Sequence, residues 1–290
     1  MARTVFLGTS DFAAAVLHRL ADSPHRPQLV VTRPDRPAGR GRRLAAPPVA
    51  DAARALGLEL VQPEKVNEPD AYAQIAAAQP DAVIVCAFGA LIREPLLSDF
   101  EILNVHPSLL PRWRGAAPVE RAMMAGDERT GVCIIRLTAG LDSGPVFLEG
   151  VEPIAPDDTY GTLAPRLREL GADLLLRTLA ERPQPVEQPE EGVTYADRLM
   201  PADRTLDSGA TAAVNDRVVR ALSPHIGARV ELADGAFLGV LRAAVRAPEE
   251  AGELRADGAH LMLGGLELLE VQPAGGRPMD AAAYLRGRKL

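Results

Sequence analysis

The sequence contains very little cysteine and no metal-binding spacing of histidine. The two cysteines, Cys86 and Cys133, lie far apart in short apolar runs. Such positions are typical of small buried hydrophobic residues rather than of a disulfide framework. The five histidines form no HExxH motif and do not accompany paired cysteines. We therefore predict neither a disulfide nor a metal site.

Long apolar runs are also missing. The N-terminal stretch MARTVFLGTSDFAAAV is interrupted at Thr9, Ser10 and Asp11, before it reaches the length of a signal peptide. No later run is long enough to cross a bilayer, so we expect a cytoplasmic protein. The chain also lacks a GxGxxG motif after its first apolar run, which argues against a nicotinamide-dependent dehydrogenase. Gly8 alone is expected to allow a close backbone approach there.

Positive charge is scarce overall but concentrated at one place. The formal net charge of −7 would normally count against a polyanionic partner. However, residues 33–43, RPDRPAGRGRR, contain five arginines and one aspartate, which gives 5 − 1 = +4 in eleven residues. This basic loop is either a phosphate-binding element or ordinary solvated surface.

The remaining composition is that of a well-packed globular protein. Hydrophobic residues make up 47% and charged residues 24% of a 290-residue chain, which is long enough for two modest domains. Short, continuously apolar runs alternate with segments of helical spacing in the first half of the chain. These runs are 4–8, 28–32, 58–62, 81–88 and 102–106. This alternation predicts an α/β, Rossmann-like domain with a mostly parallel sheet that is covered on both faces.

We expect this domain to occupy residues 1–182, with two further strands near 130–137 and 144–154 and a long helix from Thr159 to Glu181. Residues 183–207 are rich in proline and charge, which indicates a linker. A helical pattern at 212–222 then precedes several strand-like runs separated by glycine-containing turns. We predict a small antiparallel C-terminal domain over 208–290, for which an OB-like β-barrel is one candidate.

Three polar residues are candidates for catalysis. Asn104 and His106 are two residues apart at the end of a predicted strand, so their side chains should point to the same side of the sheet. Ligands bind at this end of an open parallel sheet. Asp142 lies in the glycine-flanked loop TAGLDSGPV between two predicted strands. Each residue alone could simply form a turn, but together they supply an amide donor, an imidazole and a carboxylate for acyl transfer.

Two neighbouring residues have less certain functions. Ser108 is not part of a GxSxG motif, and direct acyl transfer requires no covalent intermediate, so we assign Ser108 to substrate binding rather than to nucleophilic attack. Trp113 could stack on a base or a pterin, or could pack its own loop. Its role stays open.

Several motifs resemble those of the folate-dependent formyltransferases. They are NVHPSLLPRWRGAAP at 104–118, GLDSG at 140–144, FLGTSDFAA at 6–14, PDRPAGRG at 34–41 and LELLEVQPAGGRPMDAAAYLRG at 266–287. The resemblance covers essentially the whole chain. PDRPAGRG and RWRGAAP are similar to the members of this family that act on methionyl-tRNA.

The resemblance implies specific roles for individual residues. Asn104, His106 and Asp142 would form the catalytic set, and no metal would be needed. The tetrahydrofolate site would be lined by Ser108, Leu109, Leu110 and Pro111. The acceptor end of the tRNA would be approached by Arg36, Arg40, Arg42 and Arg43. The substrates would be 10-formyltetrahydrofolate and initiator methionyl-tRNA, with no membrane partner and no obligate protein partner evident.

The C-terminal half departs from the family pattern in one stretch. We expected an aromatic-rich segment around residues 223–232, but His225 and Arg229 stand there instead. From Arg198 onward, twelve basic residues balance twelve acidic residues, so 12 − 12 = 0. Contacts between this domain and tRNA are therefore the weakest implication of the resemblance.

Three alternative functions remain open from the residues. The first is a formyltransferase acting on a nucleotide-linked amino sugar or on glycinamide ribonucleotide, which would have little use for the basic loop. The second is a non-catalytic tRNA-binding protein on the same scaffold. The third is a Rossmann-like small-molecule-binding protein, although its glycine motif is missing.

Overall fold

The computed structural model describes residues 1–38 and 43–287. Its contacts divide the chain into two compact units. The first consists of Met1–Ala116, Thr130–Glu152 and Ala164–Tyr195, and the second of Ala117–Arg129, Pro153–Leu163 and Ala196–Leu290. Each unit thus combines segments that are distant in sequence. The domain boundaries at 182 and 208, which rest on composition, stay a prediction.

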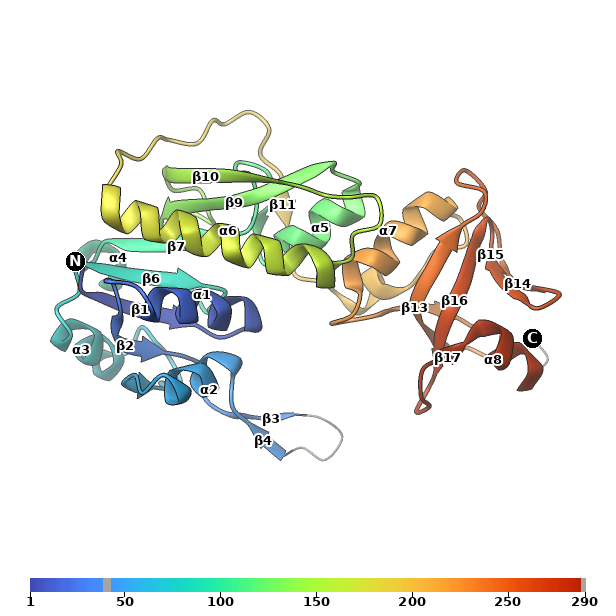
Figure 1. Ribbon diagram of the computed structural model, residues 1–290, viewed down its shortest axis with the longest axis horizontal. Coiled ribbons are helices and arrows are strands. Elements are labelled where there is room, and N and C mark those ends of the chain that lie inside the picture. The colour runs from blue at the N-terminus through green and yellow to red at the C-terminus, as the bar shows by residue number, and fades with distance from the viewer. Residues whose placement is uncertain (39–42, 288–290) are drawn as a thin grey trace. The chain divides into compact units, whose positions relative to one another are not determined.

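The first unit is built on a seven-stranded sheet in the order β10-β9-β7-β6-β1-β2-β5 (Figure 1). The strands are β1 (Thr4–Gly8), β2 (Pro27–Val31), β5 (Leu60–Val61), β6 (Ala82–Cys86), β7 (Ile102–His106), β9 (Arg129–Arg136) and β10 (Val146–Pro153). The pairings from β5 to β7 are parallel, and β9 pairs with β7 in the antiparallel direction. The predicted α/β fold with a mostly parallel sheet is confirmed.

Both faces of the central strands are covered. Every residue of β1, β6 and β7 is buried, although successive side chains of a strand point to opposite faces. The helices that lie wholly or mostly in the first unit are α1 (Asp11–Ala21), α2 (Pro48–Ala55), α3 (Pro69–Ala77), α4 (Leu96–Asp99) and α6 (Tyr160–Glu181). One cluster of the core is formed by side chains of β1, β2 and β6, among them Val5, Leu29 and Val83.

The turn from β1 into α1 shows why the sequence has a glycine there. A Cβ on Gly8 would lie 2.8 Å from the Cβ of Ala13 and 3.1 Å from the carbonyl oxygen of Cys86. Ser10 is the N-cap of α1, and its side chain accepts a hydrogen bond from the Ala13 amide. The expected close approach at Gly8 is therefore confirmed, and it involves the side chains of Phe6 and Ala13 and the backbone of β6.

Several short elements were not expected from the sequence. Strands β3 (Arg36–Ala38) and β4 (Arg43–Ala45) pair as a hairpin. Strand β8 (Arg114–Gly115) pairs with β11 (Tyr195–Ala196), which lies in the predicted linker together with the short 3-10 helix η1 (Pro201–Arg204). These pieces are too short to produce a detectable hydrophobic period.

The second unit contains an antiparallel sheet in the order β12-β13-β16-β15-β14, with β17 beside β16. Its strands are β12 (Ala228–Glu231), β13 (Phe237–Val245), β14 (Leu254–Asp257), β15 (His260–Leu263), β16 (Leu266–Pro273) and β17 (Met279–Asp280). Helices α5 (Pro118–Ala125), α7 (Ala212–Leu222) and α8 (Ala281–Gly287) also belong to it. An antiparallel C-terminal sheet is confirmed.

The two unexpected residues of this unit both contact aromatic rings. His225 stacks on Tyr160 with 3.7 Å between ring centroids, and its Nε2 lies 3.0 Å from Oε1 of Glu120. The guanidinium carbon of Arg229 lies 3.6 Å from the ring centroid of Phe237 on β13. The aromatic ring beside Arg229 is thus supplied by a neighbouring strand.

An ion pair in the second unit makes its stability depend on pH. Both guanidinium NH2 groups of Arg121 donate to the carboxylate of Asp203, each at 2.9 Å, and the Met200 amide donates to it at 2.7 Å. The hydrogen bonds from Arg121 hold the pKa of Asp203 below its usual value. The pair therefore stabilises the fold at neutral pH, and this contribution is lost as the pH falls through the lowered pKa.

We expect Asp203→Asn to lower the free energy of unfolding at neutral pH by about 1–2 kcal/mol. The difference from wild type should disappear in acid, where Asp203 of the folded wild type becomes protonated. Denaturant titrations at neutral and at acidic pH measure the free energy of unfolding of both proteins. Glu249→Gln, at an exposed carboxylate, is the control. A difference that persists unchanged in acid would contradict the assignment to this ion pair.

No helix within residues 1–38 and 43–287 combines the length and the apolar character needed to cross a membrane.

Candidate functional site

Strand β7 places two polar side chains inside the first unit. Asn104 and His106 are only 9% and 4% exposed, at the carboxyl end of a strand that lies between β6 and β9. Asn104 pairs in register with Val85 on β6, and His106 with Cys133 on β9. The predicted alternation therefore places both side chains on one face of the sheet. Buried polar groups need partners, and these come from two loops.

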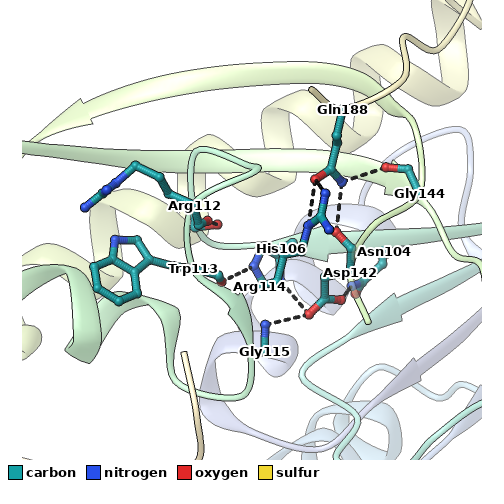
Figure 2. A network of polar contacts seen from close by, with 10 residues as sticks. Asn104, His106, Arg112, Trp113, Arg114, Gly115, Asp142, Gly144 and Gln188 are labelled. Carbon is teal, nitrogen blue, oxygen red and sulfur yellow. Dashed lines mark hydrogen bonds and ion pairs between the residues drawn. The ribbon is translucent and has the colours of Figure 1, made fainter. Parts of the chain in front are cut away.

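The first loop, between β9 and β10, carries Asp142. Its Oδ1 accepts a hydrogen bond from Nδ2 of Asn104 at 3.2 Å, and its Oδ2 lies 3.6 Å from Nδ1 of His106 (Figure 2). The Gly115 amide also donates to Oδ2, at 2.9 Å. The three residues selected from the sequence thus converge in space, although Asp142 is 38 positions from Asn104.

The imidazole of His106 is held by groups that only accept hydrogen bonds. Its Nε2 lies 2.9 Å from the carbonyl oxygen of Trp113, so this nitrogen must carry a proton and donate. Nδ1 faces the Asp142 carboxylate, 3.6 Å from Oδ2. The two ring nitrogens of His106 are therefore oriented by acceptor groups from two different segments of the chain.

In the loop after β7, two side chains make contacts that hold the loop itself. Ser108 is completely buried, and its hydroxyl donates to the carbonyl oxygen of Arg112 at 2.7 Å. Leu110 packs against Cys133 and Ile135 in a small apolar cluster. Leu109 and Pro111 are half-buried. Within segment 108–111, the side chains of Ser108 and Leu110 therefore stabilise the loop.

The cysteine nearest the site is not a nucleophile. Cys133 is fully buried opposite His106, and burial raises the pKa of its thiol to about 12. Burial also raises the pKa of Cys86. Since the thiolate is the reactive form, neither cysteine can attack a substrate at neutral pH. Ser108 donates its only proton within its loop, so the described site holds polar groups suited to direct transfer between two substrates.

The loop after β7 is the second of the two loops beside Asn104 and His106, and it also carries Trp113. The guanidinium carbon of Arg112 lies 5.1 Å from the centroid of its indole ring, within the range of a cation–π contact. Trp113 has φ of 63°, in the left-handed region, and its amide donates to Oγ1 of Thr194 at 2.9 Å. Through its carbonyl, Trp113 thus contacts His106 by backbone rather than by ring.

Comparison with known proteins identifies the chain. Residues 2–179 match the family described as formyl transferase. The methionyl-tRNA formyltransferase of Halorhodospira halophila is 45% identical over 304 residues, covering 100% of this chain and 97% of that protein. The enzyme of the same name from Dechloromonas aromatica is 41% identical, covering 99% of this chain and 96% of that protein. The chain belongs to the methionyl-tRNA formyltransferase family.

Solved structures agree on the fold. The methionyl-tRNA formyltransferase from Clostridium thermocellum superposes with a TM-score of 0.63 at 13% identity, covering 93% of this chain and 99% of that chain. HypX from Aquifex aeolicus in complex with tetrahydrofolic acid superposes with a TM-score of 0.65 at 16% identity, covering 98% of this chain and 47% of that chain. At these identities the likeness concerns the fold only.

The formyltransferase family uses formyl-tetrahydrofolate as its one-carbon donor, and the site described above fits that chemistry because it offers hydrogen-bond donors and a carboxylate but no covalent nucleophile. Within the described part of the chain, no group of three or more histidine, cysteine, aspartate or glutamate side chains could hold a metal ion.

The predicted tRNA-binding arginines of this formyltransferase are described only in part. Arg36 and Arg43 are exposed on the β3–β4 hairpin. Arg40 and Arg42 lie outside the described residues. The exposed pair leaves both guanidinium groups accessible to a phosphate backbone.

Three residues of the formyltransferase site were missed from the sequence. Gly115 contributes its backbone amide to Asp142, and Arg114 and Gln188 form a hydrogen-bonded pair next to the same loop (Figure 2). A backbone amide has no sequence signature, and Gln188 lies in a proline-rich stretch that indicates a linker. No sequence signal points to these residues, because the pairing between β8 and β11 that brings the segments together is too short to produce a hydrophobic period.

Proposed function

We propose that this chain transfers the formyl group of 10-formyltetrahydrofolate to the α-amino group of initiator methionyl-tRNA, for translation initiation. The observation that carries the proposal is similarity over the whole chain to enzymes of that name, at up to 45% identity in the two relatives described above. The convergence of Asn104, His106 and Asp142 supports it, because these groups suit an acyl transfer without a covalent intermediate.

The nucleophile in this mechanism is the methionyl amine. Peptide α-amino groups titrate at about 7.7–8.0, and an ester linkage lowers this value, so the free amine is well populated near neutral pH. Its nitrogen forms a bond to the formyl carbon, and the bond from that carbon to N10 of the folate then breaks. The amine loses one proton and N10 gains one. In the intermediate, negative charge accumulates on the formyl oxygen.

We assign Asn104 to stabilising that oxygen. The amide nitrogen of Asn104 carries two N–H groups, and the contact with Asp142 uses one of them. The second is available to a substrate oxygen. Because Asp142 and the strand fix the amide in advance, its dipole need not reorganise during the reaction. Such a donor is worth roughly 3 kcal/mol in the transition state.

We assign His106 and Asp142 to proton transfer and charge stabilisation. A cationic His106 beside the formyl oxygen would lower the energy of the oxyanion, and Asp142 would balance the ring charge and help to accept the amine proton. Nε2 of His106 is already bonded to the Trp113 carbonyl. For Nε2 to donate to the substrate, its hydrogen bond to the Trp113 carbonyl must therefore break when the substrate binds.

We retain segment 108–111 as the folate-binding segment. Since the Ser108 hydroxyl and the Leu110 side chain are used inside the loop, contacts to folate would come from its backbone and from the half-buried Leu109 and Pro111. A peptide backbone offers both donors and acceptors, which suits the polar edge of a pterin.

The decisive experiment is formylation of charged tRNA by the purified protein. With 10-formyltetrahydrofolate as donor, initiator methionyl-tRNA should be formylated much faster than elongator methionyl-tRNA. Parallel reactions with glycinamide ribonucleotide and with a nucleotide-linked amino sugar test the other acceptors. Faster transfer to either of these, or tRNA binding without any folate-dependent transfer, would contradict the proposal.

The basic loop is proposed to neutralise phosphates of the tRNA acceptor end, with contributions from Arg36, Arg40, Arg42 and Arg43. We expect Arg36→Ala combined with Arg43→Ala to weaken tRNA binding. The slope of log K against log salt should flatten by about one unit for each phosphate that the variant no longer neutralises. Binding titrations at several salt concentrations measure this slope.

The control for this measurement is Arg93→Ala, which removes an exposed arginine of the same unit outside the loop. It should leave the slope unchanged. An unaltered slope in the double variant would instead indicate that the loop arginines are ordinary solvated surface.

We further propose that the antiparallel sheet of the second unit is an OB-like barrel that adds tRNA contacts. The half-buried Arg229 and the exposed ring of Phe237 form a cation–π pair on which a base can stack. Its contribution should be smaller than that of the basic loop, because basic and acidic residues balance in this half of the chain. The proposed role in translation initiation also implies a cytoplasmic location.

A further inference from the structure

Gln188 uses its whole side-chain amide in one network of hydrogen bonds. Its Nε2 donates to the carbonyl oxygens of Asp142, at 2.8 Å, and Gly144, at 2.7 Å. Its Oε1 accepts from Nε and Nη2 of Arg114, at 3.0 and 2.8 Å. A primary amide has two N–H donors and one oxygen with two lone pairs, so each is used once. The partners also fix the orientation of the amide, because carbonyls cannot donate and a guanidinium cannot accept.

This amide joins the loop that carries Asp142 to the segment Trp113–Gly115, which contacts His106 and Asp142 (Figure 2). On one side it binds the backbone around Asp142, whose carboxylate contacts Asn104 and His106. On the other side it binds Arg114. Arg114 lies between Trp113, whose carbonyl contacts His106, and Gly115, whose amide contacts Asp142.

The backbone of Asp142 needs such support. Its φ is 43°, in the left-handed region that costs energy for a residue other than glycine. Gln188 holds the carbonyl of Asp142 itself and the carbonyl two residues later, on both sides of the turn. A Cβ on Gly144 would lie 1.9 Å from the carbonyl oxygen of Arg136, so the loop also fits tightly against β9.

Gln188 itself is anchored by the segment that carries it. Val186 forms an antiparallel bridge with Val146 of β10, with both N–H to carbonyl distances at 2.8 Å. Further along, Oγ1 of Thr194 accepts from the Trp113 amide at 2.9 Å. The segment is therefore fixed to the sheet on one side of Gln188 and to the Trp113 loop on the other.

We infer that Gln188 is a positioning residue for formyl transfer, which sets the Asp142 carboxylate against Asn104 and His106. This inference rests on the proposed function, and it concerns a residue that touches neither substrate nor the reacting atoms. Loss of the two donated hydrogen bonds would free the Asp142 turn to leave its strained conformation. The carboxylate would then point at His106 in only a fraction of molecules, and turnover would fall accordingly.

The test compares Gln188→Glu with wild type. The new carboxylate can still accept from Arg114, but it cannot donate to the carbonyls of Asp142 and Gly144 and repels their oxygens, so the contacts on the Asp142 side of the network are lost. We expect kcat for methionyl-tRNA to fall about tenfold to a hundredfold, with KM for tRNA changed less than about threefold. Glu187→Ala, at an exposed position next to Gln188, should match wild type.

A double-mutant cycle separates positioning from a general structural effect. If Gln188 acts through Asp142, then Gln188→Glu should change kcat less than about twofold in an Asp142→Ala background. An equal loss in both backgrounds would overturn the inference. So would a Gln188→Glu enzyme with wild-type kcat.

Hydrogen exchange gives a readout that does not depend on activity. The amides of residues 142–144 should exchange faster in Gln188→Glu than in wild type or Glu187→Ala. Unchanged exchange in this loop would overturn the inference whatever the activity. If wild type formylates a different acceptor amine, the proposed function fails, and the same cycle run with that acceptor still tests Gln188.

Discussion

Replacing Asn104 with alanine should lower kcat by about 10²–10³-fold while leaving the affinity for tRNA nearly unchanged. We propose that the second N–H of Asn104 donates to the oxyanion, because its other N–H is held by Asp142. That interaction strengthens only as charge develops on the oxygen, so its loss affects the transition state more than substrate binding. Steady-state kinetics with methionyl-tRNA, together with tRNA binding, measures both quantities.

A substitution to aspartate at the same position is a stricter test. Asn104→Asp keeps the shape of the side chain but replaces the donor with an acceptor and places a second carboxylate beside Asp142. Its loss of kcat should be at least as large. The matched control is Asn67→Ala, at a half-buried amide that also makes local hydrogen bonds: its Nδ2 donates to the Leu91 carbonyl at 2.8 Å, and its Oδ1 accepts from the Arg93 amide at 2.9 Å. If Asn104→Ala keeps kcat within about threefold of wild type, Asn104 is not an oxyanion donor.

The sequence predicted this part of the site because strand geometry is regular. Residues two apart on a strand point to the same face, so Asn104 and His106 could be paired before their surroundings were known. The central strands were predicted for a similar reason, since continuous apolar runs such as AVIVC indicate burial on both faces. Asp142 came from a glycine-flanked loop and from the family resemblance rather than from any periodic pattern.

What the sequence did not reveal depends on backbone groups and on distant segments. The Trp113 carbonyl and the Gly115 amide contact His106 and Asp142, and any residue could supply them. Gln188 lies 46 positions after Asp142, in a segment whose proline and glutamate content indicates a solvated linker. Its position follows from a short β-bridge and from hydrogen bonds that become visible only once the sheet is formed.

Ser108 shows the opposite difficulty. Its place in the family motif favoured a contact with folate, but its hydroxyl is buried and bonded to the Arg112 carbonyl. A motif defines which residue occurs at a position and not which of its atoms faces a ligand. For this segment, backbone contact is the proposal consistent with the side-chain geometry.

Asp142→Asn should be the most damaging conservative substitution in the site, with a loss of kcat of about 10³-fold. The wild-type carboxylate accepts at both oxygens, from Asn104 at Oδ1 and from the Gly115 amide at Oδ2. An asparagine has one acceptor oxygen, so its NH2 group must face one of these two donors. The substitution also removes the negative charge that lies 3.6 Å from Nδ1 of His106.

We expect this loss to affect the formyl-transfer step, in which we propose that His106 also acts. Groups that act as a unit give non-additive losses, so Asp142→Asn combined with His106→Ala should be little slower than the slower single variant. Single-turnover formylation at saturating methionyl-tRNA isolates the transfer step, and Asp70→Asn on the exposed face of α3 is the matched control. Losses that simply multiply in the double variant would show that His106 and Asp142 act independently, and the charge pairing between them would then have no part in the transfer.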